Sequence, residues 1–566
     1  MSLDGYSRFS VDRGRSRLAV VIVMFGVLFG LIAAKLAYLG LVPEAKNSRG
    51  ARYATTTSRP DLTDRNGQLL ATDIKTISLF AEPRRIIDAD EAGERLRTVL
   101  PELDAQALHA QLSSDAGFVW LQRKLSPDQQ QRIFNLGLPG IGFMPENRRF
   151  YPASATASHV VGFVDVDNRG IAGMEKYVDD QGYRDLQVEG IAASGNLNPV
   201  KLSLDIRIQN IVRDELVTAM TRYKAIAAGG VILDVDTGEV RAMVSLPDYD
   251  PNDPKDALLK DRLNRMSAGT FEMGSTFKSF TTAMALDSGL VKITDSFDAS
   301  RPLNIGGFTI NDFHGKGRRL TVPEIFEYSS NIGTAKEAEV VGIEAHRAFL
   351  TKMGLLTRLN TELPETALPT QPKIWKKLNS VTISFGHGVS TTPLQTASAA
   401  AALMNGGGLI PPTFLPRSRE EAGKLKVAVV SKKTSDLMRY LYQLNGQKGS
   451  GRSAQVAGYR VGGNTGTAEK VVNGRYSANK RFNSFVAAFP IDAPRYVVLV
   501  ILDEPQVEDG KAGATAGSNA APTVGAIIRR SAALLEVRPD FELEGKIVPT
   551  QECRSLLPNS GSTLEC

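Results

Sequence analysis

Cysteine is nearly absent from this 566-residue sequence, which contains only Cys553 and Cys566, both close to the C-terminus. This scarcity excludes a disulfide-stapled fold and any cysteine-rich zinc module, so the core must hold by burial alone. Lysines and arginines form no long run, which makes nucleic acid a poor candidate partner. Histidines are few, and their dispersed positions disfavour a metal enzyme: His109, His159, His314, His346 and His387.

The overall composition indicates a protein of several domains that folds mostly in water. Apolar residues make up 42% of the chain and charged residues 23%, close to the averages for globular proteins. These values exclude a disordered, collagenous or polytopic membrane protein. At roughly 150 residues per domain, the length suggests about three or four domains.

One long apolar segment, residues 18–42, stands apart from this composition. Its only charge is Lys35, and at about 1.5 Å per residue a helix of this length exceeds the roughly 30 Å hydrocarbon core of a membrane. The segment is also longer than the apolar region of a cleavable signal peptide. Arginines precede it, which places residues 1–17 in the cytoplasm and the rest of the chain outside. We therefore predict a cytoplasmic tail, a single membrane anchor at 18–42 and a large extracytoplasmic body.

The extracytoplasmic body divides into two predicted modules and a tail. The turn Asp64–Gly67 lies between extended, alternating segments, which indicates a β-rich start. Helical spacing then predicts a helical insertion at about 86–138, in which Ser126 serves as an N-cap. We expect the first module, a pedestal, to span 43–209. The second module is expected at 210–537 and the tail at 538–566.

The second module has strands at both of its ends and helices between them. Residues 231–244 read VILDVDTGEVRAMV, a hairpin pattern with its turn at Asp236–Gly238. Two more strand patterns cover 482–489 and 496–502, and an apolar helical stretch follows at 522–535. This order favours an α+β fold in which helices cover an antiparallel sheet, because a βαβ chain would alternate strand and helix throughout.

Ser275 and Lys278 lie at the start of a predicted helix in FEMGSTFKSF, on one helical face. A serine nucleophile needs a base at neutral pH, and a lysine one turn away can serve if burial and nearby cations lower its pKa. Free N–H groups at the start of the helix would stabilise an oxyanion. The spacing alone is weak evidence, because it recurs at Ser477 and Lys480 in a polar segment where a solvated lysine is expected.

Two further segments carry polar groups suited to acyl transfer. In Ser329-Ser330-Asn331, a hydroxyl can relay a proton and the amide can bind a peptide carbonyl. The segment Asn464-Thr465-Gly466-Thr467 predicts a strand against which an extended peptide can lie. Taken alone, the first segment is typical of a loop or helix N-cap, and the second of a weak edge strand.

Together, the three segments resemble the penicillin-binding serine acyltransferases, whose motifs S-x-x-K, S-x-N and K-T-G occur in this order. The flanking sequences resemble the class B penicillin-binding proteins and, within them, the division-specific transpeptidases. Those sequences are Asp64–Gly67, Arg149–Pro152, residues 162–179, residues 384–395 and residues 484–490.

The resemblance implies a periplasmic D,D-transpeptidase that crosslinks peptidoglycan stem peptides at the division septum and is acylated by β-lactams. It implies that Lys278 accepts the proton of Ser275, that Ser329 shuttles a proton, and that no metal or cofactor takes part. The backbone N–H groups of Ser275 and Thr467 would form the oxyanion hole. The implied substrate-binding residues are Asn331, Asn464, Thr465, Gly466 and Thr467.

The resemblance also implies partners and a compartment. A septal glycosyltransferase and other membrane proteins of the division machinery are expected partners, since no glycosyltransferase module is apparent in the chain. Nucleic acid is not expected. In the oxidising compartment implied here, Cys553 and Cys566 are predicted to pair and close a small loop in the tail.

Asn464 departs from the family pattern, because it occupies the position of the lysine in K-T-G. A lysine there would lower the pKa of Lys278 and add positive field at the substrate strand. Three interpretations follow: a weakened enzyme, a site that uses Lys470 or protonated His387 as its cation, or a variant retained as a division scaffold or β-lactam sensor. A β-lactamase or carboxypeptidase would share S-x-x-K, but the long N-terminal module and retained anchor argue against a free-standing β-lactamase.

Overall fold

The computed structural model describes residues 22–33, 35, 58–182, 197–472, 474–508 and 513–542. The chain forms two compact units, Met1–Thr55 and Thr56–Cys566. In the first unit, residues 22–33 are helical. Among the described residues, no helix is both long and apolar enough to cross a membrane. Much of the predicted anchor, and both members of the predicted cysteine pair, lie outside the described residues.

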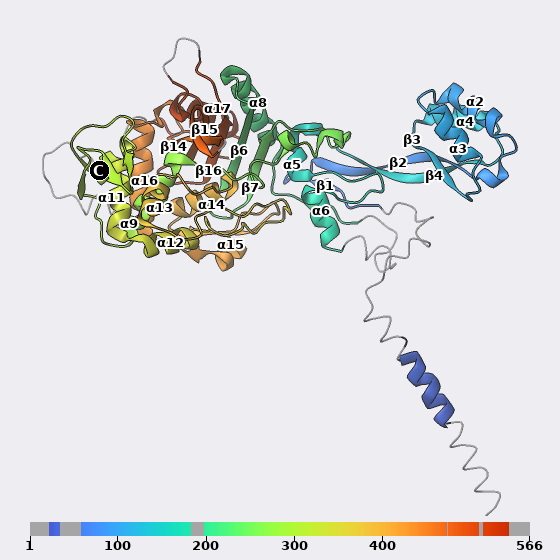
Figure 1. Ribbon diagram of the computed structural model, residues 1–566, viewed down its shortest axis with the longest axis horizontal. Helices are drawn as coiled ribbons and strands as arrows, with labels where there is room; N and C mark the ends of the chain where they lie inside the picture. The colour runs from blue at the N-terminus through green and yellow to red at the C-terminus, as the bar shows by residue number, and fades with distance from the viewer. Residues whose placement is uncertain are drawn as a thin grey trace, which may run out of the picture. The chain divides into compact units, whose positions relative to one another are not determined.

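The N-terminal part of the second unit is built on the long strand β2 (Leu69–Ala81) (Figure 1). The predicted turn at Asp64–Gly67 joins β2 to the short antiparallel strand β1 (Leu62–Thr63), which confirms the β-rich start. Strand β4 (Ile141–Phe150) pairs with β2 along most of its length. Strand β5 (Val200–Lys201) pairs in parallel with β1, so the chain returns to the base of this sheet before it enters the second module.

A small lobe at the end of β2 contains the helices α2 (Ala89–Val99), α3 (Ala105–Leu112) and α4 (Pro127–Asn135). Ser126 caps α4 in a capping box, as predicted. The predicted helical insertion at about 86–138 contains these helices, and it also contains a strand that was not predicted, β3 (Val119–Leu125), which pairs with β2 between α3 and α4. A strand forms there because β2 supplies hydrogen-bond partners from a distant part of the chain.

Buried charges tie the pedestal together next to the helices α5 (Ser158–Val161) and α6 (Gly173–Asp180). The guanidinium of Arg149 pairs with Glu175 at 2.6 Å and with Asp73 at 3.1 Å. His159 is buried, and its Nε2 lies 2.6 Å from the carbonyl oxygen of Arg262. These contacts connect β2, β4 and α6, and they give His159 a packing role.

The second module contains a five-stranded antiparallel sheet in the order β14-β15-β16-β6-β7. The predicted hairpin is β6 (Ala227–Asp234) and β7 (Val240–Leu246). The predicted strands near the C-terminus are β15 (Arg475–Phe489) and β16 (Tyr496–Asp503), and β14 (Gly462–Val472) forms the edge. The predicted α+β class, with helices over an antiparallel sheet, is therefore confirmed.

Helices cover both faces of this sheet because its strands alternate between two cores. Val498 and Val500 pack in one core with α8 (Ile206–Tyr223) and α17 (Ala520–Ser531). Leu499 and Ile501 face the other core, with α9 (Lys278–Asp287), α14 (Pro393–Met404) and α16 (Lys432–Gln447). The central strand is thus buried on both sides.

Helices α10 (Val322–Glu327), α11 (Asn331–Val341) and α12 (Ile343–Lys352) pack against α9. Helix α13 (Lys377–Ser384) packs against α11, and the other helix of this module is α15 (Arg419–Leu425). The short strand pairs are β8 (Ser296–Asp298) with β11 (Arg319–Thr321), β9 (Leu303–Ile305) with β10 (Phe308–Ile310), and β12 (Gly408–Leu409) with β13 (Val427–Ala428). The 3-10 turns are η2 (Pro83–Arg85), η3 (Ser154–Ala157), η4 (Pro254–Asp256), η5 (Lys260–Arg262), η6 (Gly274–Phe277), η7 (Arg452–Ala454) and η8 (Ala516–Ser518).

Candidate active site

Ser275 lies in η6, which leads directly into α9 and places Lys278 one turn after the serine. Ser275 is partly exposed, whereas the Lys278 residue is 2% exposed. Gly274, just before the serine, has a φ of +55° and lies against the backbone of Thr467, where an added Cβ would be 3.2 Å from its atoms. The backbones of the first and third predicted motifs are therefore adjacent.

Lys278 connects the first predicted motif to the second. Its Nζ donates to the Ser329 carbonyl oxygen at 2.5 Å and contacts the Ser329 Oγ at 2.9 Å. Ser329 lies between α10 and α11 with a φ of +53°, a backbone conformation that is uncommon for a residue other than glycine. Conformations of this kind persist where the surrounding contacts impose them, and here they bring the serine hydroxyl to the lysine.

Burial lowers the pKa of Lys278 to about 7, while the charges of Asp312 and Glu337 act in the opposite direction. Desolvation disfavours the charged ammonium, so a substantial fraction of the lysine is free base at neutral pH. A free amine within hydrogen-bond distance of a hydroxyl can take up and return a proton. Lys278 is therefore suited to act as a general base even though residue 464 carries no positive charge.

The side chains of Ser330 and Asn331 have different environments. Ser330 caps α11, and its Oγ also donates to the Asp312 carboxylate at 2.7 Å. The Asn331 amide Nδ2 donates to the Asn311 carbonyl oxygen at 2.9 Å and remains partly exposed. The interpretation as a helix cap thus holds for Ser330, whereas Ser329 faces the lysine.

Asn464 forms part of a neutral hydrogen-bond network behind the serine. The residue is 1% exposed, and its Nδ2 donates to the Ser275 carbonyl oxygen at 3.0 Å and to the Ser279 Oγ at 3.2 Å. Its Oδ1 accepts from the Asn445 amide at 3.4 Å. Tyr442 completes the network by donating to Ser279 at 3.0 Å. The asparagine therefore holds the backbone of the predicted nucleophile without adding charge.

The neighbouring residues of β14 alternate between two sides of the strand. Gly466 lies so close to the first motif that an added Cβ would be 2.1 Å from the Met273 carbonyl oxygen. On the other side, the Thr465 Oγ1 lies 2.6 Å from the Ser450 Oγ, and the Thr467 Oγ1 accepts from the Ala516 N–H at 3.1 Å. Because β14 is an edge strand, one side of its backbone has no partner strand in the described sheet.

Neither proposed replacement for the missing lysine has the required environment. Lys470 Nζ is held by Asp503 and Glu504, each at 2.8 Å. Burial lowers the pKa of His387 to about 4, assisted by the charge of Lys278, so this histidine is neutral at pH 7.

At the second S-x-x-K sequence, Lys480 is half-exposed and pairs with Glu504 at 3.2 Å, as expected for a surface lysine.

Two acidic residues near the lysine were not found from the sequence, Asp312 and Glu337. Asp312 belongs to no motif and reaches Ser330 through a loop. Glu337 is fully buried on α11, where its Oε2 accepts from the Thr282 hydroxyl at 2.8 Å and burial raises its pKa to about 8. Of the two, only Glu337 fits a sequence pattern, because Ser330, Thr334 and Glu337 follow one another at helical spacing on one face of α11.

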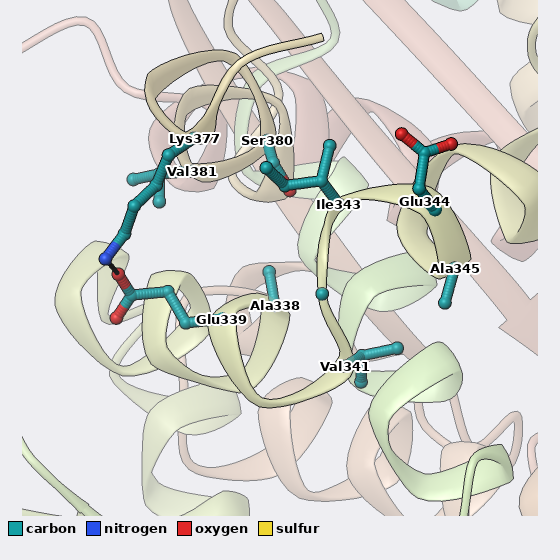
Figure 2. A pocket seen from close by; sticks show the side chains of 10 residues that line it. Ala338, Glu339, Val341, Ile343, Glu344, Ala345, Lys377, Ser380 and Val381 are labelled. Atoms are coloured by element: carbon teal, nitrogen blue, oxygen red, sulfur yellow. Dashed lines mark ion pairs between the residues drawn. The ribbon is translucent and has the colours of Figure 1, made fainter.

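A pocket of about 640 Å³ lies at the far end of α11, away from the predicted motifs. Figure 2 shows residues of α11, α12 and α13 around it and the ion pair between Lys377 and Glu339, whose charged atoms are 2.9 Å apart. None of the predicted catalytic or substrate-binding residues lines this pocket. The predicted site is instead where η6, the Ser329 loop and β14 meet.

Two family models match the chain. The penicillin binding protein transpeptidase domain matches residues 228–529, and the penicillin-binding protein dimerisation domain matches residues 54–192. The probable peptidoglycan D,D-transpeptidase FtsI of Caulobacter vibrioides is 39% identical over 94% of this chain and 90% of the relative. The peptidoglycan D,D-transpeptidase FtsI of Escherichia coli is 31% identical over 91% of this chain and 92% of the relative.

Solved structures show the same fold. A crystal structure of penicillin binding protein 3 from Mycobacterium tuberculosis, complexed with aztreonam, matches with a TM-score of 0.65 and 23% identity. The match covers 86% of this chain and 98% of the solved chain. A peptidoglycan synthetase from Bifidobacterium adolescentis matches with a TM-score of 0.66 and 22% identity.

Proposed function

Because the chain belongs to the penicillin-binding protein transpeptidase family, we propose that it is a septal peptidoglycan D,D-transpeptidase that β-lactams acylate. The names of the similar proteins from Caulobacter vibrioides and Escherichia coli support this activity. The observation that carries the proposal is the buried Lys278, whose lowered pKa and contacts with Ser329 suit a general base one turn after Ser275.

In the proposed reaction, Ser275 Oγ attacks the carbonyl carbon of the penultimate D-Ala of a donor stem peptide as Lys278 takes its proton. The backbone N–H groups of Ser275 and Thr467 stabilise the oxyanion. Ser329 relays a proton to the leaving amine, the terminal D-Ala departs, and an ester to Ser275 remains. The amine of a second stem peptide then attacks this ester, which forms the crosslink and frees the serine.

The donor peptide is proposed to lie in extended form along the open edge of β14. Added strands of this kind gain affinity from main-chain hydrogen bonds, and neighbouring side chains supply specificity. The Asn331 amide is assigned to a peptide carbonyl and Thr465 to the substrate on the strand side. Asn464 and Gly466 are assigned to support of the nucleophile segment. Asn464 donates to the Ser275 carbonyl oxygen, and Gly466 allows β14 to lie close to Met273.

The chain is further proposed to act at the bacterial inner membrane. The apolar segment 18–42 and the arginines before it support a single anchor, with residues 1–17 in the cytoplasm and the catalytic module in the periplasm. The proposed modules remain the pedestal at 43–209, the transpeptidase module at 210–537 and the tail at 538–566. A septal glycosyltransferase is the proposed partner, because crosslinking needs newly made glycan strands as its substrate.

The first prediction concerns covalent labelling of the serine. Intact-protein mass spectrometry of the native chain after exposure to a β-lactam should show one adduct, which peptide mapping places on Ser275. The variant Ser275→Ala should show no adduct, whereas Ser477→Ala, which alters the other S-x-x-K sequence, should be labelled like the native chain. A folded native protein without an adduct would refute the assignment of the nucleophile.

A further inference from the structure

Lys316 lies beside the second motif and has no carboxylate partner among the described residues. Its Nζ is 4.5 Å from the centre of the Tyr328 ring, and Tyr328 directly precedes Ser329. The other cations of this loop are engaged, since Arg318 pairs with Glu324 at 2.7 Å and Arg319 donates to the Ser296 carbonyl oxygen at 2.6 Å. Lys316 is therefore a cation held near the predicted catalytic residues by an aromatic face.

Lys448 lies beside the third motif, just as Lys316 lies beside the second. It directly follows α16 and is exposed, and Ser450, two residues later, contacts the Thr465 hydroxyl with an oxygen separation of 2.6 Å. Within the part of the chain that the structure describes, neither Lys448 nor Lys316 has a carboxylate within ion-pair distance. The two lysines thus flank the predicted site on its Ser329 side and on its β14 side.

Glu327 connects these two positions. An added Cβ at Gly449 would lie 2.9 Å from the Glu327 carbonyl oxygen, so the end of α16 is adjacent to the end of α10. Burial raises the pKa of Glu327, while the charges of Lys448 and Lys316 lower it, which places both ammonium groups within electrostatic range of one carboxylate. Glu324 also acts on this carboxylate and is itself paired with Arg318, so three cations and two anions leave an excess of one positive charge here.

We propose that Lys316 and Lys448 bind a carboxylate of the donor stem peptide at the entrance to the active site. This inference rests on the proposed transpeptidase function. Stem peptides that end in D-Ala are anionic, and an excess positive charge at the entrance attracts them and aligns them for reaction. Asn464 adds no charge to β14, so Lys316 and Lys448 provide the positive electrostatic potential at the edge of the site.

The carboxylate could come from the terminal D-Ala or from an acidic residue before the D-Ala pair. A fluorescent penicillin tests the first source, because it carries a carboxylate at the position of the terminal one. Two N-acetylated peptides ending in D-Ala-D-Ala test the second source when the preceding residue is glutamate in one and glutamine in the other. Each peptide is measured by how strongly it slows penicillin acylation.

The double variant Lys316→Gln/Lys448→Gln is compared with Lys260→Gln/Lys424→Gln, which removes the same charge from other surfaces. For exposed ion pairs we expect a loss of about two- to fivefold per lysine. That loss should appear either in the penicillin acylation rate or in the preference for the glutamyl peptide, and should shrink in high salt. Glu327→Gln should change the same quantity in the opposite direction.

Either a slower penicillin reaction or a lost glutamyl preference, absent from the control pair, would support the inference and identify the source of the carboxylate. A double variant that matches the control pair in both assays would overturn it. Circular dichroism and the melting temperature show whether each variant is folded. If the native chain is not acylated, the proposed function fails and this inference fails with it, whereas normal native acylation with an unchanged double variant refutes the inference alone.

Discussion

The chemistry of the predicted site depends on how one buried lysine loses its charge. Desolvation lowers the pKa of Lys278 to about 7, against the opposing charges of Asp312 and Glu337. A lysine at position 464 would lower it further, but Asn464 instead donates hydrogen bonds to the Ser275 carbonyl oxygen and the Ser279 hydroxyl. Burial therefore lowers the pKa of Lys278 without help from a neighbouring cation, whereas in the family pattern a lysine contributes to this lowering.

The effect of the missing charge should depend on pH. A lysine introduced by Asn464→Lys would lower the pKa of Lys278 below about 7 and increase its free-base fraction most strongly in acid. We expect fluorescent penicillin to acylate this variant several times faster than the native chain at about pH 6, but at a similar rate at about pH 8. The measurement is the second-order acylation rate across this range.

Asn464→Met is the matched control, because methionine approaches the length of lysine without its charge. This variant loses the amide hydrogen bonds as well, so it reports the cost of disturbing the network behind Ser275. A gain for the lysine variant in acid that methionine does not reproduce would be due to charge. Equal rates for native and lysine variants at every pH would mean that the missing charge is irrelevant.

Glu337 should make folding stability depend on pH. Its pKa is raised by burial from 4.5 to about 8, so the folded state binds this proton more tightly than the unfolded state. That stabilisation is complete below pH 4.5 and is lost as pH rises toward about 8. Glutamine carries no charge, so Glu337→Gln should gain stability relative to the native chain over this window, by up to roughly 1.4 kcal/mol per pH unit.

The measurement is the difference in unfolding free energy between variant and native chain at several pH values between 5 and 8. Glu339→Gln is the control on the same helix, since this carboxylate forms a surface pair with Lys377 at 2.9 Å. Its difference from the native chain should stay nearly constant with pH. A flat difference for Glu337→Gln would show that the buried carboxyl does not take up a proton on folding.

At the scale of elements, local patterns were enough for part of the fold. Turn chemistry and alternation predicted the β6–β7 hairpin, and Ser126 predicted the start of α4. Strand β3 could not be predicted, because its partner β2 lies far away in the sequence. The same limit applies to the site: motifs indicated Ser275, Lys278 and Ser329, whereas Asp312 and Lys448 are brought close only by tertiary packing.

At the scale of the whole molecule, the described cores indicate which parts depend on one another. Leu62, Leu70 and Tyr151 of the pedestal share one hydrophobic core with Phe277 and Phe280 beside the predicted nucleophile. By contrast, the lobe of α2, α3 and α4 packs around its own core, which contains Leu96 and Leu108. The base of the pedestal should therefore support the site, and the lobe should not.

This separation predicts that the lobe can be removed without loss of acylation. Ala81 of β2 and Ile141 of β4 are paired partners in the antiparallel ladder, so an Asn-Gly turn can replace residues 82–140 and close the hairpin. We expect the shortened protein to react with fluorescent penicillin at a rate within about twofold of the native chain, because the core beside Ser275 is unchanged.

The contrasting variant is Tyr151→Ala, which truncates a side chain in the shared core. Large-to-small changes of this kind commonly cost about 3–5 kcal/mol, so this variant should melt at a lower temperature than the native chain and lose acylation on mild heating. The shortened protein should keep its acylation after the same treatment. If removal of the lobe slowed acylation while the melting temperature stayed unchanged, the lobe would have to influence the site through contacts other than the shared core.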